Sequence, residues 1–241
     1  MNRRDELAAA LARLTTRIER AARSAGRDPA DIRVVAVTKT FPAQDAALLT
    51  DLGVTDLGEN RDQEGGRKAE ELRLLRPAAT PCWHMVGRLQ RNKARTVVRW
   101  AAVVQSVDSR RLADALHRAV RAALDAGHRC GPLDVLLQAS LDDDPGRGGC
   151  PLAELPQLAD QVAASDELRL RGLMAVAPFG TEPDRAFETL HVAAVALRAR
   201  HPAATELSAG MTGDLEAAIR HGSTCVRVGT ALLGSRPLTS P

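Results

Sequence analysis

The sequence predicts an α/β fold, a single (β/α)8 TIM-type barrel with an extra N-terminal helix. Eight short apolar segments alternate with helical segments along the chain, and repeated βα units of this kind form a parallel sheet. The length of 241 residues fits a closed barrel, whose usual size is about 250 residues. A doubly wound open sheet is the alternative, but no GxGxxG turn follows the first predicted strand.

The first predicted element is a helix within residues 1–28, which precedes the barrel. One apolar stripe at helical spacing indicates it: Leu7, Leu11, Leu14 and Ile18. Gly26 and Pro29 end this helix, and IRVVAVTK follows as a short buried strand. We expect one domain over 1–241, with the barrel at 30–237, because no linker or change in composition divides the chain.

The βα alternation begins with a helix over 42–52, placed between a first-turn Pro42 and a C-terminal Gly53. Strands are then predicted at 54–60, 81–87, 102–108, 133–140, 168–176, 206–210 and 225–232. The intervening helices are predicted at 61–75, 89–100, 109–127, 151–165, 184–201 and 212–222. The pair Gly65-Gly66 is expected to weaken the first turns of the helix over 61–75.

The composition excludes several functional classes. A formal net charge of +3, 2% aromatic residues and the absence of Tyr disfavour nucleic-acid binding, since neither a basic surface nor a stacking platform is indicated. No segment has the apolar length of a membrane span. The four cysteines are scattered, without the spacing of a metal site. We expect a soluble cytoplasmic protein with reduced thiols and no metal.

Lysine is scarce, which directs attention to the position of each one. The 33 Lys+Arg residues include only Lys39, Lys68 and Lys93. Lys39 ends the first predicted strand with the parity of Val35 and Val37, so it is expected to point into the barrel at the carboxyl end, where barrels carry their sites. A lysine can form an imine, which arginine cannot. A solvated lysine is the alternative.

The other two lysines are expected to be ordinary surface charges. Lys68 lies in a polar predicted helix, and Lys93 lies among arginines in LQRNKAR, where a solvated helical face is favoured over a phosphate or nucleic-acid patch.

Polar residues also end the second, third and fourth predicted strands. They are Glu59, Asn60, His84, Ser106 and Asp108. Their convergence on one rim is expected to be informative, although each has an ordinary alternative. His84 fits a hydrogen-bonded core histidine, and the Asp108-Ser109 pair fits a helix N-cap.

The last two predicted strands carry the pattern of an anion site. Arg227 lies between two valines that are expected to face the helices, so its guanidinium enters the barrel, where it needs an acceptor or an anion. Gly229 and Thr230 open a turn with exposed backbone N–H groups. Ser208 and Thr212 follow the preceding strand, and phosphate commonly binds between these two loops. Thr212 fits a helix N-cap equally well.

A lysine on the first strand, an anion site after the last two and an inward arginine suit a ligand with an aldehyde at one end and a phosphate at the other. Pyridoxal 5′-phosphate (PLP) is such a ligand, and its ring nitrogen would face Arg227.

Several long motifs occur in order between about residues 30 and 237: VTKTFP, GENRDQE, WHMVGRLQRNK, SVDS, GLMAVAP, LSAGMTGDLEAAIRHGST and VRVGTALLGSR. They resemble the signature segments of the pyridoxal phosphate homeostasis protein family, which is similar to the N-terminal barrel of alanine racemase. The resemblance implies PLP held as a Schiff base on Lys39. It further implies phosphate contacts near Ser208, Thr212, Gly229 and Thr230, with Arg227 facing the ring nitrogen. Asn60 and His84, among the polar residues that end the second and third strands, are also expected to bind the cofactor. Arg88 and Arg91 stand at positions where the family more often has proline and serine.

The resemblance implies intracellular PLP and vitamin B6 homeostasis, with no catalytic residues and PLP-dependent apoenzymes as acceptors. Two further observations favour a binding protein over an enzyme: no Tyr is available as a second base, and an always-protonated Arg227 makes the cofactor a poor electron sink. An amino-acid racemase or an aldolase-type lyase that uses Lys39 is the alternative, and a regulator acting through protein contacts is a third. The sequence ends after the barrel, so a monomer is expected.

Overall fold

The computed structural model describes residues 2–142 and 148–234, so the predicted end of the barrel at 235–237 lies outside the described residues. Eight parallel strands form the barrel: β1 (Arg33–Val37), β2 (Asp56–Glu59), β3 (Cys82–Met85), β4 (Val103–Val107), β5 (Leu133–Ser140), β7 (Leu168–Met174), β8 (Glu206–Ser208) and β9 (Cys225–Val228). They neighbour one another in chain order, β9 pairs with β1, and pairing of β4 with β5 completes the closed sheet. The predicted fold class is confirmed.

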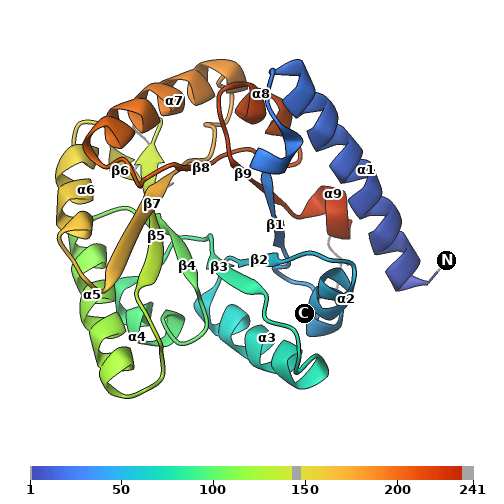
Figure 1. Ribbon diagram of the computed structural model, residues 1–241, viewed down its shortest axis with the longest axis horizontal. Coiled ribbons are helices and arrows are strands. Elements are labelled where there is room, and N and C mark those ends of the chain that lie inside the picture. Colours follow the sequence, from blue (N-terminus) through green and yellow to red (C-terminus); the bar gives the residue numbers. More distant parts are fainter. Residues whose placement is uncertain (1, 143–147, 235–241) are drawn as a thin grey trace.

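The helices lie outside the strands (Figure 1). They are α1 (Arg3–Ser24), α2 (Ala43–Asp51), α3 (Asp62–Leu75), α4 (Ala94–Val97), α5 (Arg110–Asp125), α6 (Leu155–Ala163), α7 (Pro183–Arg200), α8 (Leu215–Arg220) and α9 (Thr230–Leu233), with 3-10 turns η1 (Pro29–Asp31) and η2 (Arg91–Lys93). Among the described residues, no helix combines the length and the apolarity that crossing a bilayer requires.

The leading helix α1 packs on the outside of the barrel, beside α8 and α9 (Figure 1). Leu7, Leu14 and Ile18 form its buried stripe, as predicted. The side chain of Asn2 caps its first turn by accepting a hydrogen bond from the Asp5 N–H. An ion pair between Arg17 and Glu216 joins it to α8. The helix therefore covers apolar residues of the last βα units.

Two local predictions were wrong. The segment predicted as one helix over 89–100 forms only η2 and the single turn of α4. A further strand, β6 (Cys150–Pro151), pairs with the end of β5 and was not predicted. Two residues are too few for a periodic signal, and the pairing depends on Gly149, where a Cβ atom would lie 2.9 Å from the backbone nitrogen of Ser140.

The glycine pair in α3 admits a tryptophan ring. A Cβ atom at Gly65 would lie 2.5 Å from the ring of Trp100, and the Trp100 indole N–H donates to Asp62 at 2.9 Å. The helix nevertheless begins at Asp62. Tertiary packing against Trp100 therefore compensates for the low helix propensity of glycine.

The apolar core lies mainly between the strands and the surrounding helices, in two large clusters of buried side chains. A much smaller apolar cluster contains Val103, Leu136 and Met174, which come from three barrel strands.

An ion-pair network lies towards the amino-terminal end of the barrel. Glu206 lies 3.2 Å from Arg33 and 3.1 Å from Arg171. Arg171 also lies 3.7 Å from Asp134, and Arg33 lies 3.8 Å from Asp56. These residues belong to five different strands, and three of them, Arg33, Asp56 and Glu206, begin their strands. The network thus joins strands that are far apart in the sequence.

Candidate binding site

Lys39 lies two residues after β1, at the carboxyl end of the barrel. Val35 and Val37 share its parity and approach Gly58 of β2 inside the barrel, because a Cβ atom at Gly58 would lie 2.9 Å from Val35 and 3.4 Å from Val37. The amine of Lys39 has no hydrogen bond or ion pair within the described chain. It is therefore available to a ligand.

The peptide groups on both sides of Lys39 are held by two charged side chains of α3, the buried Lys68 and the half-buried Glu64. The Lys68 amine donates to the Thr38 carbonyl oxygen at 2.7 Å and to Glu59 Oε1 at 2.6 Å. It also lies 3.2 Å from Glu64, whose carboxylate accepts from the Thr40 backbone N–H at 2.5 Å. Thr40 has a φ of 67°, a conformation that costs energy unless its surroundings hold it.

The prediction that Lys68 is a surface charge was wrong, since only 3% of the residue is exposed. Glu59 is fully buried, and its second oxygen, Oε2, has no hydrogen-bond partner among residues 2–142 and 148–234. Burial raises the pKa of Glu59, although Lys68 and Thr38 oppose that change. Both side chains lie between the sheet and α3, so Glu59 does not belong to the rim of the barrel.

The loops after β8 and β9 meet beside Lys39. A Cβ atom at Gly229 would lie 3.2 Å from the Val37 carbonyl oxygen, so these two chain segments are in close contact. The Thr212 hydroxyl accepts from the Ala231 backbone N–H at 3.2 Å. No hydrogen bond within the described residues uses the backbone N–H of Gly229 or Thr230. These N–H groups can therefore bind an anion.

The alternative role of Thr212 as a helix N-cap is not supported. The helix α8 begins at Leu215, and its N-cap residue is Asp214. The Asp214 carboxylate instead accepts from the Met211 backbone N–H at 2.6 Å.

Arg227 enters the barrel from β9, as its position between two valines predicts. Val226 and Val228 pack in the outer apolar cluster, whereas the guanidinium of Arg227 donates to the Ser208 hydroxyl at 2.7 Å and to the Ala175 carbonyl at 2.8 Å. It is 5% exposed, and burial lowers its pKa. No carboxylate of the described residues forms an ion pair with it. A buried cation without a counter-charge is costly.

A directed chain of hydrogen bonds runs from Arg227 across the barrel. Because the Ser208 oxygen accepts from Arg227, its hydrogen goes to Gln105 Oε1 at 2.7 Å. The Gln105 amide nitrogen then lies 3.0 Å from His84 Nδ1, which accepts, and His84 Nε2 donates to Asp56 at 2.9 Å. The chain thus fixes the neutral tautomer of His84 with its proton on Nε2.

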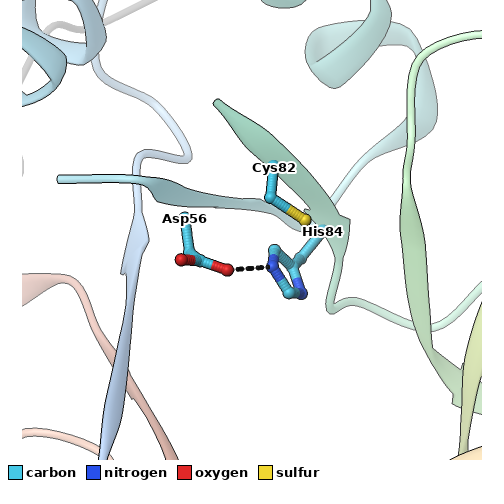
Figure 2. Close-up of side chains that lie close together, drawn as sticks. All are labelled: Asp56, Cys82 and His84. Carbon is cyan, nitrogen blue, oxygen red and sulfur yellow. Dashed lines mark hydrogen bonds and ion pairs between the residues drawn. The ribbon is translucent and has the colours of Figure 1, made fainter. Parts of the chain in front are cut away.

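Figure 2 shows the far end of this chain, where Asp56, Cys82 and His84 lie together. Their ligand atoms lie within 4.8 Å of one another, which is close enough for a metal. However, both ring nitrogens of His84 already have partners in the chain. Burial raises the pKa of Cys82 to about 12, so its thiol stays protonated. Hydrogen bonding within the barrel accounts for Asp56 and His84, and Cys82 lies beside them as a protonated thiol.

The predicted site residues therefore separate into two levels. Lys39, Thr212, Gly229 and Thr230 meet at the carboxyl mouth of the barrel, and Arg227, Ser208 and His84 form a buried layer of polar groups. Asn60 is half-buried at the rim, where its backbone oxygen would lie 2.3 Å from a Cβ atom at Gly87. Ser106 is a buried residue within β4, so its predicted place on the rim was wrong.

Sequence reasoning missed Lys68, Gln105 and Asp56. The scarcity of lysine was a usable signal for Lys68. Gln105 was detectable as a polar residue in the middle of an apolar strand, where it must find partners. Asp56 carried no signal beyond its place at the start of a strand.

Fold and site together define a barrel of the alanine racemase N-terminal domain class, since a family model described as "Alanine racemase, N-terminal domain" matches residues 10–237. The pyridoxal phosphate homeostasis protein of Mycobacterium bovis is 48% identical, with 100% of this chain and 96% of the relative covered. The Escherichia coli K12 protein of the same name is 40% identical, over 96% of this chain and 97% of the relative. The chain therefore belongs to the pyridoxal phosphate homeostasis protein family.

Solved structures agree with this assignment. PipY of Synechococcus elongatus PCC7942, in a structure with PLP bound, is 33% identical with a TM-score of 0.77, covering 95% of this chain and 100% of PipY. A protein from Bifidobacterium adolescentis has a TM-score of 0.86 at 32% identity, over 96% of this chain and 97% of that protein. Alanine racemase from Corynebacterium glutamicum shares the fold at 16% identity and a TM-score of 0.69, with 60% of the racemase covered.

Proposed function

We propose that the chain binds PLP at the carboxyl mouth of the barrel and serves PLP homeostasis. The observation that carries the proposal is the contact between two chain segments: the end of β1, which bears the unpartnered Lys39 amine, touches Gly229 of the loop with unused backbone N–H groups. An aldehyde and a phosphate on one small molecule would occupy both. The PLP-bound structure of PipY supports this choice of ligand.

Lys39 would hold PLP covalently as a Schiff base, and the phosphate would bind Gly229, Thr230 and Thr212. A Cβ atom at Gly229 would come within 3.2 Å of the Val37 carbonyl oxygen, a tight contact, so glycine favours the close approach of the two segments here. Asn60 would lie at the opposite side of the mouth. The site thus binds the two ends of the ligand by different chemistry.

Arg227 would face the ring nitrogen of PLP, which supplies an acceptor to a buried guanidinium that lacks a carboxylate partner. Ser208 and His84 are fully buried, and both form hydrogen bonds with Gln105. We therefore infer that these two residues act by orienting Arg227 and not by contacting the phosphate.

We propose that turnover is weak or absent. PLP supplies an electron sink when its ring nitrogen is protonated, and an arginine at that position keeps the nitrogen unprotonated. The sequence also offers no Tyr as a second acid or base. The relatives are named as homeostasis proteins, which agrees with a role in holding PLP and passing it to PLP-dependent apoenzymes. A cytoplasmic monomer fits this role, and the four cysteines are all free thiols.

Borohydride reduction of PLP-treated protein, followed by mass analysis of peptides, tests the assignment of the lysine. We expect the label on Lys39 alone. Label on Lys68 or Lys93, or no label on any lysine, would contradict the proposal. Turnover of an amino acid beyond one equivalent, abolished by Lys39→Ala, would instead establish an enzyme of racemase or lyase type.

A further inference from the structure

A long groove lies at the carboxyl face of the barrel, over β2, β3 and β4. Its volume is about 1850 Å³, and it extends from Asn60 at the start of α3, along the connection between β3 and α4, to the first turns of α5. The groove therefore begins at the mouth that contains the candidate PLP site and continues outward over the surface.

Cationic side chains dominate the lining of this groove. Six of them have no ion pair with any residue in the described ranges: Arg61, Arg88, Arg91, Lys93, Arg111 and Arg118. A seventh, Arg67, pairs with Glu71. By contrast, the formal net charge of the whole chain is only +3. Seven of the 33 Lys+Arg residues therefore line this one groove.

The acidic residues of the groove do not neutralise these cations. The lining contains Asp62, Glu64 and Asp108. The Asp62 carboxylate accepts from Thr96 and from the Trp100 indole. The Glu64 carboxylate accepts from the Lys68 amine and from a backbone N–H. Two of the three acidic groups are therefore turned towards the protein, and the groove presents an excess of positive charge to solvent.

The size and chemistry of the groove favour one kind of occupant. Small-molecule pockets are mostly apolar and about 300–1,000 Å³ in volume, whereas this groove is larger and mainly polar. None of its lining residues is aromatic, so it offers no surface on which unpaired bases could stack. Arginine binds carboxylates through two parallel hydrogen bonds. An extended acidic polypeptide satisfies these conditions best.

We propose that this groove docks an acidic segment of the protein that exchanges PLP with this chain. Docking itself depends only on the groove. The exchange step rests on the proposed function, because it requires PLP at the neighbouring mouth. A partner held in the groove would present its own cofactor site close to that mouth, which raises the effective concentration for transfer.

A labelled peptide of alternating Glu and Gly residues tests docking, with fluorescence anisotropy as the readout. We expect it to bind at least about tenfold more tightly than the same peptide with Gln for Glu, and to weaken as salt increases. The double variant Arg91→Glu, Arg111→Glu should lose at least about tenfold in affinity. The variant with Gln at both positions guards against a folding defect and should also bind more weakly.

The matched control is Arg13→Glu, Arg185→Glu, which makes the same change in net charge at exposed positions outside the groove. It should bind the peptide within about twofold of the original chain. Equal losses in both double variants would contradict the proposal, as would binding that neither variant affects. Tighter binding of a single-stranded oligonucleotide or of inorganic tripolyphosphate, lost in the groove variant, would assign the groove to another ligand and would also contradict it.

Two further measurements separate docking from cofactor binding. Lys39→Ala should leave the affinity for the peptide unchanged. Failure to form the Schiff base on Lys39 would therefore not count against docking in the groove. Fusing the Glu/Gly peptide to a PLP-dependent apoenzyme should speed its activation by PLP-loaded protein, and Arg91→Glu, Arg111→Glu should remove the gain. Intact peptide binding without faster activation would overturn the exchange step, and loss of PLP labelling at Lys39 would overturn the proposed function alone.

Discussion

The Lys68 amine lies 2.7 Å from the carbonyl oxygen of Thr38, the residue immediately before Lys39. On the other side of Lys39, Glu64 holds the Thr40 N–H and also contacts Lys68. One buried lysine thus stabilises the backbone that carries the other. This arrangement links the stability of the fold to the geometry of the candidate site.

Replacing Lys68 with Met should destabilise the chain strongly. The change leaves Glu59 buried beside Thr38 without its cation, and breaking a buried ion pair in this way typically costs about 3–5 kcal/mol. Urea unfolding monitored by circular dichroism measures the loss. Lys93→Met, at a half-buried groove position without an ion pair, is the control and should change stability by less than about 0.5 kcal/mol. Similar losses in both variants would contradict the role given to Lys68.

The cost of Lys68→Met should depend on pH. Burial raises the pKa of Glu59 even with Lys68 present, and removing Lys68 raises it further. A carboxyl group whose pKa is raised by folding stabilises the fold below its unfolded pKa, and this contribution is lost as pH rises through the folded pKa. The variant should therefore lose less stability at about pH 5 than at about pH 8. Adding Glu59→Gln should remove most of that difference.

Asp56→Asn tests the last member of the series of hydrogen bonds that runs from Arg227 to Asp56. Burial would raise the pKa of Asp56, but hydrogen bonds from His84 and Thr55 and the charge of Arg33 hold it below the ordinary value. Such a group stabilises the fold above its unfolded pKa, and the contribution is lost as pH falls through the folded pKa. We expect the free energy of unfolding to fall by about 1.5–3 kcal/mol at neutral pH. We also expect it to depend less on pH in the acid range than in the original protein. The exposed Asp125→Asn should change neither quantity.

Gln105→Leu should interrupt, at its centre, the series of hydrogen bonds that runs from Arg227 to Asp56. The Ser208 hydroxyl and His84 Nδ1 would both lose a partner inside the barrel, at a cost of about 1–3 kcal/mol. Nitrogen NMR of the original chain should show His84 protonated on Nε2 with Nδ1 accepting a hydrogen bond, and the Nδ1 signal should shift in the variant because that nitrogen loses its donor. The exposed Gln63→Leu is the comparison. An unchanged His84 signal in Gln105→Leu would show that the proposed direction of the chain is wrong.

Gly87→Ala should displace the Asn60 loop, because the added Cβ atom would lie 2.3 Å from the Asn60 backbone oxygen. Overpacking of this kind costs about 1–3 kcal/mol, and the melting temperature should fall accordingly. PLP affinity should fall with it if Asn60 borders the site. Gly131→Ala is the matched control, since nothing lies within 4 Å of its added methyl group.

The cysteines should differ sharply in reactivity towards Ellman's reagent. Cys130 is exposed, whereas burial raises the pKa of Cys82 to about 12 and that of Cys150 to about 11. The thiolate is the reactive form, so Cys130 should supply the fast phase in native protein. Cys130→Ser should remove this phase, and a fast phase that persists would contradict the burial of the others.

The sequence was sufficient for the architecture because each βα unit carries its own periodicity and turn residues. It was also sufficient for the inward direction of Arg227, since strand parity decides it. It was insufficient for Lys68. Lysine scarcity marked Lys68 as unusual, but a helix that is polar on most faces does not show which face turns towards the sheet. Only the closed barrel brings Glu59 and Thr38 beside α3.

The series of hydrogen bonds from Arg227 to Asp56 could not be predicted from the sequence for a similar reason. Gln105 and Ser208 are 103 positions apart, and their contact depends on the curvature of the closed sheet. His84 was correctly given a core alternative, but its partners could not be named. The meeting of the loops after β8 and β9 was predictable, because neighbouring βα loops of a barrel gather at the same end.

The ion-pair network of Arg33, Asp56, Asp134, Arg171 and Glu206 has a kinetic consequence for the proposed function. Its charged side chains lie across the amino-terminal end of the barrel, so PLP bound above Arg227 would leave through the carboxyl mouth by which it entered. A recipient protein would then have to meet the ligand at that mouth.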